Sequence, residues 1–442
     1  GGGRVFRAGA GAGAGSAGVG VWDTERLFAG ERSTSLVRTL AVLQALSVGP
    51  LVDVATAALR SPAVAGSAAG RAAARATRVP ALLRRGDRRG GRGGRCAPLA
   101  RRRLGGILDY GIEDAEDGPA CDRNAAGFLA AIDVAAALPP GSASVCIKIT
   151  ALCPVALLEK ASDLLRWQQK HPATKLPWKV HGSRPLYLTA AEPPALEAEE
   201  ERELEMAHGR LLAIGERCAE YDIPLLVDAE YATVQPAIDY FTFAGALAFN
   251  GGGRPIVHGT VQAYLRDARD RLEAMARAAQ GERVCLALKL VRGAARLAAS
   301  LGVPSPVHRS IQDTHDCYNG CAAFLLDRAA GAAAVTLATH NVESGQLAAA
   351  RALELGIGGG GDRGLQFAQL MGMADGLSLG LRNAGFQVSK YLPYGPVEQI
   401  IPYLIRRAEE RDRGLLSSSS FDRQLLRKEL VRRFKAAMLG RE

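Results

Sequence analysis

Long hydrophobic runs are missing from this 442-residue sequence. No uncharged apolar stretch approaches the roughly 18 residues that a membrane-spanning helix needs. No Gly-x-Gly-x-x-Gly motif follows an early strand, which argues against a nucleotide-binding Rossmann domain. The eight cysteines form no Cys-x-x-Cys pair and no Cys/His cluster with zinc-finger spacing. We therefore expect buried free thiols in a reducing compartment and no metal site.

Acidic residues are almost absent from one short segment, and this segment accounts for the net charge of +10. Residues 71–103 contain twelve Arg and one Asp, which give +11, so the remaining chain sums to −1. The charge therefore does not indicate a broadly basic surface for nucleic acid, and no nucleic-acid partner is expected. An Arg-rich protein that binds nucleic acid through 71–103 alone is the most distant alternative.

Composition divides the chain into four parts. Residues 1–23 are rich in Gly, Ala and Ser and carry Arg4 and Arg7, which is typical of a remnant of an organellar transit peptide. A plain low-complexity tail fits nearly as well. Residues 24–60 place leucines at helical spacing, and 106–442 form the main domain. The Arg/Gly/Ala-rich segment 61–105 cannot bury enough apolar surface to fold alone, so we expect it to be disordered.

Short apolar runs alternate with helix-like stretches from residue 106 onward. Strands are expected at 106–112, 145–151, 223–230, 256–264, 285–294, 333–341, 365–373 and 387–395. Helices are expected at 124–138, 196–220, 262–280, 309–330, 343–355, 374–384 and 397–411. Continuous hydrophobicity indicates strands buried on both faces, and alternation with helices indicates a parallel sheet. Eight such units predict a (β/α)8 barrel of the TIM type, with an open doubly wound sheet as the competing fold.

Charged and polar side chains stand at the ends of most of these strands, where a barrel forms its active site. They are Lys148, Asp228, Glu230, Gln262, Tyr264, Lys289, Arg292, Thr339, His340, Asn341, Lys390 and Tyr391. Lys and Asp inside apolar runs are costly unless they are paired or functional. Any one of them could form a structural ion pair, but five strands that end in this way indicate a functional site.

The helix expected after the eighth strand places Tyr403, Arg406, Arg407 and Glu410 on one face. Paired guanidinium groups bind carboxylates in a bidentate manner. A solvated Arg pair with Glu410 as its helical partner is the competing interpretation. Cations outnumber anions at the expected barrel mouth, which favours an anionic ligand or cofactor.

Five motifs in a fixed order give the chain a family resemblance. They are Lys-Leu-Val-Arg-Gly-Ala at 289–294, Ala-Thr-His-Asn at 338–341, Leu-Met-Gly-Met at 370–373, Tyr-Leu-Pro-Tyr-Gly at 391–395 and Tyr-Leu-Ile-Arg-Arg at 403–407. Together they resemble proline dehydrogenase, and 311–319 looks like the plant mitochondrial branch of that family. The resemblance covers about 106–438 well and 24–60 loosely.

The resemblance implies FAD at the carboxyl face of a distorted TIM-like barrel, with the last helix over the mouth. The implied reaction is oxidation of L-proline to Δ1-pyrroline-5-carboxylate by hydride transfer to flavin N5, with a quinone as electron acceptor. The implied location is mitochondrial, on the matrix side, with peripheral association with the inner membrane.

The implied site residues fall into three groups. The catalytic pair would be Asp228 and Lys289, with Asp228 organising its neighbours rather than acting as a strong base. Substrate binding would involve Lys148, Leu370, Tyr391, Tyr403, Arg406 and Arg407. Cofactor binding would involve Ala229, Gln262, Arg292, Gly293, Ala294, Thr339, His340 and Glu410, the last of which would also tie the final helix to the site.

Two departures from the family pattern stand out. Ala295 replaces the usual Tyr, and 61–105 lacks the acid-containing helical segment of the family. Tyr391 would press where 4-hydroxyproline carries its hydroxyl, so we expect a preference for proline. A hydroxyproline-preferring paralogue, another flavin or folate barrel oxidoreductase, and a catalytically dead barrel are the alternatives.

Overall fold

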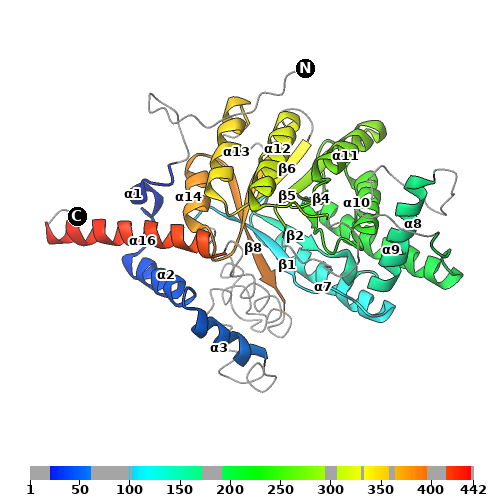
Figure 1. The fold of residues 1–442 in the computed structure, drawn as a ribbon, viewed down its shortest axis with the longest axis horizontal. Helices are drawn as coiled ribbons and strands as arrows, with labels where there is room; N and C mark the ends of the chain where they lie inside the picture. Colours follow the sequence, from blue (N-terminus) through cyan, green and yellow to red (C-terminus); the bar gives the residue numbers. More distant parts are fainter. Residues whose placement is uncertain are drawn as a thin grey trace.

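A closed barrel of eight parallel strands forms the centre of the molecule (Figure 1). The computed structural model describes residues 20–60, 99, 102–171, 192–293, 306–329, 333–357, 364–395 and 415–439. The strands are β1 (Gly105–Tyr110), β2 (Ala143–Ile147), β3 (Leu225–Val227), β4 (Val257–Gln262), β5 (Leu286–Val291), β6 (Ala333–Ala338), β7 (Leu365–Leu370) and β8 (Gln387–Tyr394). Each strand pairs with the next in chain order, and β1 closes the ring on β8. The predicted barrel is confirmed, and the open sheet is excluded.

The expected strands are confirmed in position but mostly run too far at their carboxyl ends. β3, for example, ends at Val227, whereas the apolar pattern extends its expected span to Glu230. The extra residues leave the sheet and turn over the barrel mouth. This is where polar side chains become available to a ligand, as in other barrels of this type.

Helices surround the barrel between the strands (Figure 1). They are α7 (Gly118–Ala136), α8 (Val155–Lys170), α9 (Ala198–Glu220), α10 (Gln235–Phe249), α11 (Ala268–Glu282), α12 (Ile311–Ala329), α13 (Val342–Glu354) and α14 (Asp375–Asn383). Neither α8 nor α10 was expected from the sequence. The helix expected from residue 262 begins only at Ala268, because Gln262 still belongs to β4. The helix expected at 397–411 lies outside the described residues.

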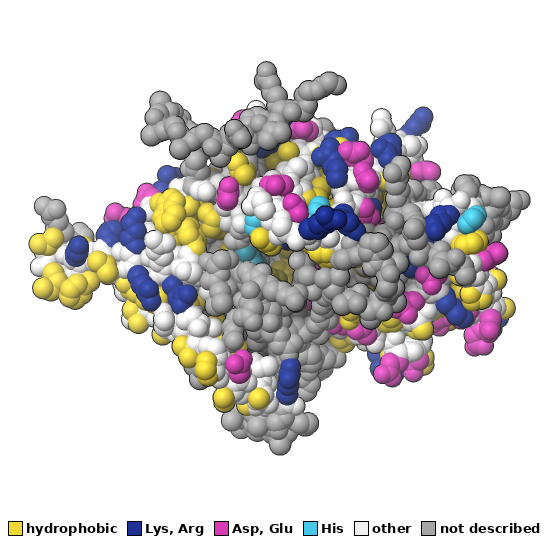
Figure 2. Space-filling view, in the orientation of Figure 1, with side chains coloured by type: hydrophobic (Ala, Val, Ile, Leu, Met, Phe, Trp, Pro, Cys, Tyr) yellow, Lys and Arg dark blue, Asp and Glu magenta, His cyan; other side chains and the backbone are white. Residues whose placement is uncertain are grey.

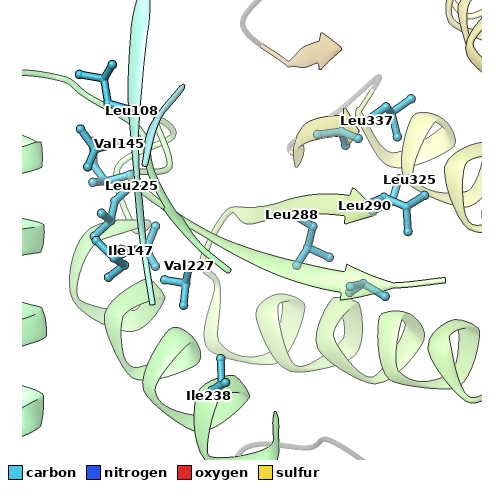
Figure 3. Packing of buried hydrophobic residues seen from close by; sticks show 14 of the residues in the cluster. Leu108, Val145, Ile147, Leu225, Val227, Ile238, Leu288, Leu290, Leu325 and Leu337 are labelled. Carbon is cyan, nitrogen blue, oxygen red and sulfur yellow. The ribbon is translucent and has the colours of Figure 1, made fainter. Parts of the chain in front are cut away.

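Alternation along the strands sends one set of side chains to the helices and the other into the barrel. Figure 3 shows outward residues such as Val145, Ile147 and Leu225, which pack into the large core between sheet and helices. The side chains that point into the barrel form a separate small cluster. It consists of Ile107, Cys146, Leu226 and Ala368, and Tyr391 packs against it. Side chains two residues apart on a strand point to the same side. The barrel interior therefore also receives the charged side chains of Asp109, Lys148, Asp228 and Lys289.

The N-terminal segment, which was expected to be helical over 24–60, forms three helices. They are α1 (Thr24–Leu27), α2 (Ser33–Ala45) and α3 (Gly49–Arg60). In Figure 1, α1 and α2 lie beside the C-terminal helix α16 (Leu415–Met438), and α3 extends away from it. Buried residues of α1, α2, α14 and α16 form a second core, which includes Leu27, Leu36 and Leu425. Hydrophobic side chains also remain exposed along this part of the molecule, including Val42 and Phe434 (Figure 2).

Most of the Arg/Gly/Ala-rich segment 61–105 lies outside the described residues, but its end is packed. Leu99 is buried in the main core. Arg102 pairs with Glu31 at 2.5 Å and with Asp375 at 3.0 Å, and so links the N-terminal helices to α14. The expectation of disorder is therefore wrong for this end of the segment. Within the described parts of the chain, no helix is both long and apolar enough to cross a bilayer.

Candidate active site at the barrel mouth

Asp228 lies at the centre of the charged groups inside the barrel. It follows β3 directly and receives a hydrogen bond from Lys289 of β5. Its second carboxylate oxygen accepts a hydrogen bond from the Tyr391 hydroxyl at 2.7 Å. Lys148, directly after β2, lies 3.5 Å from the same oxygen. Four residues that the sequence separates widely are thus brought together, as expected for strand ends that meet at one mouth.

Asp109 completes this network and was missed in the sequence. It lies near the end of β1, is fully buried, and accepts a hydrogen bond from Lys148 at 2.8 Å. Like Lys148, Asp109 is a charged residue inside an apolar run. The free-energy cost of burying an unpaired charge could therefore have identified it from the sequence. Its presence changes the charge balance, because Lys148 and Lys289 are matched by Asp109 and Asp228. The expected excess of positive charge is therefore not found among these interior residues.

Burial and pairing shift the protonation equilibria of these groups in opposite directions. Burial alone would raise the pKa of Asp228, but the nearby ammonium groups of Lys289 and Lys148 lower it well below its usual range. Burial would lower the pKa of Lys148, yet Asp109 and Asp228 together raise it. Asp228 is therefore an ionised carboxylate and a poor proton acceptor, which agrees with an organising role.

Glu230 has the opposite character. Its carboxylate lies two residues beyond Asp228 and accepts hydrogen bonds from the Thr150 backbone and hydroxyl. Burial raises the pKa of Glu230 to about 7, although Thr150 and Lys148 act against this shift. The carboxyl group therefore carries its proton part of the time near neutral pH. Asp228 thus stays ionised near neutral pH, whereas Glu230 titrates there.

Arg292 organises the other side of the mouth, at the end of β5. Its guanidinium donates hydrogen bonds to the Thr339 hydroxyl, to Ser344 Oγ at 2.5 Å and to His315 Nδ1 at 3.1 Å. The group also lies over the ring of Tyr318 at 4.2 Å from the centroid. Burial lowers the pKa of Arg292, but a guanidinium group keeps its positive charge near neutral pH. His315, Ser344 and Tyr318 were not recognised as site residues from the sequence.

The remaining candidates at the mouth have mainly backbone or packing roles. His340 accepts a hydrogen bond from the backbone N–H of Leu370 at 3.0 Å. Ala229 lies between Asp228 and Glu230. Gly293 has a φ of +90°, and a Cβ there would approach Tyr264 Cδ1 to 2.2 Å, so only glycine fits. Lys390 points away from the interior, since it bonds Met373 O at 2.7 Å and Asp375 at 2.9 Å.

Five expected site residues lie outside the described residues: Ala294, Tyr403, Arg406, Arg407 and Glu410. Gln262 is described and is buried at the end of β4. Its Nε2 donates to the Glu230 carbonyl at 3.1 Å, while its Oε1 is buried with no hydrogen-bond partner among the described residues. A buried orphan acceptor is costly, and this one suits a ligand that brings an N–H group.

A closed eight-stranded α/β barrel with ionised groups clustered at the carboxyl ends of its strands defines an enzyme of the TIM-barrel class. The match to known families is more specific. Residues 95–420 match the family described as proline dehydrogenase, and the chain belongs to that family.

Two plant relatives resemble the chain over almost its whole length. Arabidopsis thaliana proline dehydrogenase 2, mitochondrial, is 47% identical over 448 residues, which cover 94% of this chain and 90% of the relative. Proline dehydrogenase 1, mitochondrial, from the same plant is 46% identical, and the alignment covers 94% of this chain and 87% of that relative. The hydroxyproline dehydrogenase of Bos taurus is 33% identical over 336 residues, and the alignment covers 72% of this chain and 70% of that relative.

Solved structures share the fold at lower identity. Proline utilization A (PutA) from Bdellovibrio bacteriovorus, inactivated by N-propargylglycine, aligns with a TM-score of 0.59 and 18% identity. The alignment covers 89% of this chain but only 38% of that much longer protein. At this identity the likeness supports the barrel architecture alone.

Proposed function

We propose that this member of the proline dehydrogenase family oxidises L-proline to Δ1-pyrroline-5-carboxylate with FAD as the hydride acceptor. The observation that carries the proposal is the network at Asp228, which fixes Lys148, Lys289 and Tyr391 around one carboxylate. Oxidation of an amine by hydride loss needs no side-chain nucleophile. It needs orientation of the substrate and a fixed electrostatic environment, which this network is suited to supply.

The substrate carboxylate would be bound by cations at the mouth. Lys148 is the described candidate, and Arg406 and Arg407 are assigned to the same role from the family motif. Tyr391 and Leu370 would pack against the pyrrolidine ring, with Tyr403 completing the pocket. Loss of one of the two arginines should weaken proline binding by roughly 2–4 kcal/mol, because it leaves a buried carboxylate short of a partner.

Asp228 would position the cations rather than take a proton. Its lowered pKa makes it a weak base near neutral pH. Its two oxygens already accept hydrogen bonds from Lys289 and Tyr391, and the Lys148 ammonium lies 3.5 Å away. Lys289 would present its ammonium group beside the reacting centre, held there by Asp228 and by Cys146 Sγ at 3.8 Å. A fixed cation at that position favours the development of negative charge on the electron acceptor.

The cofactor would be held on the side of the mouth formed by β4, β5 and β6. The orphan Oε1 of Gln262 is an acceptor that fits a flavin ring N–H. Arg292, Gly293, Ala229, Thr339 and His340 are the neighbouring described candidates, and Ala294 and Glu410 are assigned from the motif alone. When bound, FAD supplies the hydride acceptor that no side chain of this protein can provide.

The cellular setting is inferred from the relatives. Both plant relatives are named as mitochondrial proteins. We infer a mitochondrial location on the matrix side, with transfer of electrons to a quinone and peripheral association with the inner membrane. Exchange of electrons with a quinone-containing membrane extract after reduction by proline would test this part.

The decisive experiment is a visible spectrum of the purified protein before and after anaerobic addition of L-proline. We expect a flavin band that proline bleaches, and much slower bleaching by 4-hydroxyproline. A flavin band that proline leaves unchanged would defeat the assignment. Asp228→Asn should retain the band and lose most of the bleaching rate, because it loses the charge that orients Lys148 and Lys289.

A further inference from the structure

The C-terminal helix α16 leaves an apolar stripe open to solvent. Val431, Phe434 and Met438 are exposed by 53%, 67% and 73%, and they follow one another at intervals of three and four residues. Side chains at this spacing lie on one face of a helix. Large apolar side chains that are exposed together, rather than singly, indicate an interaction surface.

Basic side chains flank this stripe. Arg427 lies on the same face, one turn before the stripe, and Lys428 and Lys435 lie along its edge. All three side chains are exposed. The two acidic residues of α16, Asp422 and Glu429, are both buried. The exposed face of α16 is therefore apolar and positively charged.

The neighbouring helix α2 continues this surface. Arg427 donates a hydrogen bond to Gln44 Oε1 at 2.8 Å, so the exposed faces of the two helices adjoin. Val37 lies two turns before Gln44 on the same face of α2 and is exposed, and α2 contains no acidic residue. On α1, the carboxylate of Glu25 is paired with Arg432 at 3.0 Å.

Hydrophobic and basic side chains lie together over α16 and α2 at the left of Figure 2. We call this surface the apolar–basic face and define it by Val37, Arg427, Lys428, Val431, Phe434, Lys435 and Met438.

The helix α16 is anchored on the side of the barrel that holds the proposed site. Asp422 accepts hydrogen bonds from the backbone N–H groups of Asp375 and Gly376, each at 3.0 Å. These two residues begin α14, which follows the carboxyl end of β7. Leu425 and Leu426 pack into the second core. The apolar–basic face therefore has a fixed position relative to the barrel mouth.

We propose that the apolar–basic face docks the protein on the surface of a bilayer that carries anionic headgroups. A helix with Phe and aliphatic side chains beside Lys and Arg lies in the plane of such an interface, with its apolar side buried about 5–10 Å into the headgroup region. The flanking cations are attracted to anionic lipid. A second copy of this chain is a poorer fit, because Lys is depleted at contacts between proteins.

This inference rests on the proposed function in one respect, since it names the surface used for the membrane association proposed above. Docking through α16 would bring the barrel mouth close to the membrane. A lipid-soluble quinone would then be near the reduced cofactor. The binding of vesicles does not itself depend on the oxidation of proline.

The test is co-flotation of the full-length protein with vesicles. One set contains phosphatidylcholine with about one-fifth cardiolipin, and the other contains phosphatidylcholine alone. We expect binding to the cardiolipin vesicles that weakens with added salt, and at least about tenfold weaker binding to the neutral vesicles. Equal binding to both sets, or no binding to the cardiolipin vesicles, would overturn the proposal.

Substitutions of exposed residues locate the contact. The double variant Phe434→Ser, Met438→Ser removes apolar contacts and Lys435→Glu reverses one charge, so each should weaken binding by about tenfold or more. Met206→Ser is the matched control, because Met206 is also exposed but lies among the carboxylates of α9. This control should bind like the unmodified protein. Full binding by both α16 variants, or an equal loss in the control, would refute the assignment of the surface.

A reporter on the stripe distinguishes insertion from adsorption elsewhere on the protein. Phe434→Trp should be quenched by lipids brominated on their acyl chains more strongly than the native tryptophans are. Equal quenching would contradict docking through α16. A dimer that forms without vesicles and dissociates in the double variant would identify the face as a contact between copies, and would also overturn the proposal.

Flavin reduction separates this proposal from the proposed function. In the double variant, L-proline should bleach the flavin as fast as in the unmodified protein, while reduction of a quinone dissolved in the cardiolipin vesicles should fall in proportion to the lost binding. Unchanged quinone reduction would refute the link between docking and electron transfer. Failure of proline to bleach the flavin of the unmodified protein would instead refute the proposed function, so the two failures are distinguishable.

Discussion

Replacement of Asp109 by Asn should weaken both the fold and the proposed site. Asp109 is fully buried, and it is the nearer of the two carboxylates that face Lys148, at 2.8 Å against 3.5 Å for Asp228. Removal of one partner from a buried ion pair costs about 3–5 kcal/mol when no other partner remains. Because Asp228 remains near Lys148 and Asn keeps the shape of Asp, we expect Asp109→Asn to lower the free energy of unfolding by about 2–3 kcal/mol.

The kinetic effect follows from the same geometry. Without Asp109, the Lys148 ammonium should move toward Asp228, away from the position proposed for the substrate carboxylate. We expect the KM for proline to rise about tenfold, which corresponds to about 1.4 kcal/mol of binding free energy. Urea unfolding measures the first effect, and the rate of proline-dependent flavin reduction measures the second.

A remote buried ion pair provides the control. Asp239 of α10 pairs with Arg271 of α11 at 2.6 Å, and both side chains are almost fully buried. Asp239→Asn should therefore cost a similar free energy of unfolding but leave the KM for proline unchanged. The reasoning fails if Asp109→Asn costs less than about 1 kcal/mol, or if Asp239→Asn raises the KM as much.

Three further predictions concern single residues at the mouth. The folded-state pKa of Glu230, about 7 against an ordinary 4.5, means that the folded protein holds this proton more tightly. Stability should therefore fall by about 2–3 kcal/mol as pH rises from 4.5 to 7, and Glu230→Gln should lose this dependence in urea unfolding at both ends of the range. Gly293→Ala should destabilise more than Gly253→Ala in thermal melts, since both have positive φ but only the first meets a side chain, that of Tyr264. Tyr391→Ser should raise kcat/KM for 4-hydroxyproline relative to proline; an unchanged ratio would contradict the proposed contact of Tyr391 with the ring.

The barrel could be predicted because its strands are buried on both faces. Each strand then forms an uninterrupted apolar run, and a polar residue such as Lys148 stands out at its end. The ends of the strands were less predictable. The expected third strand extends to Glu230, but β3 ends at Val227. The residues from Asp228 onward follow the apolar run directly in the sequence, yet they leave the sheet and form the site.

The misses also have physical causes. α10 is apolar on nearly all sides, as Phe241 and Phe243 illustrate, so it lacks the polar face that makes a helix visible in a sequence. His315 and Tyr318 look like ordinary helix residues until the fold brings Arg292 against them. Their role depends on contacts between distant elements, which no local pattern encodes.

Charge balance links the interior network to the 403–407 motif. Asp109 and Asp228 already neutralise Lys148 and Lys289, and Asp228 stays ionised near neutral pH. Hydride loss requires proline with a neutral amine, which carries a net negative charge from its carboxylate. Placing that anion beside two matched ion pairs would leave an unbalanced buried charge, which is costly. A second source of positive charge is therefore needed at the mouth, and the paired arginines of the 403–407 motif can supply it.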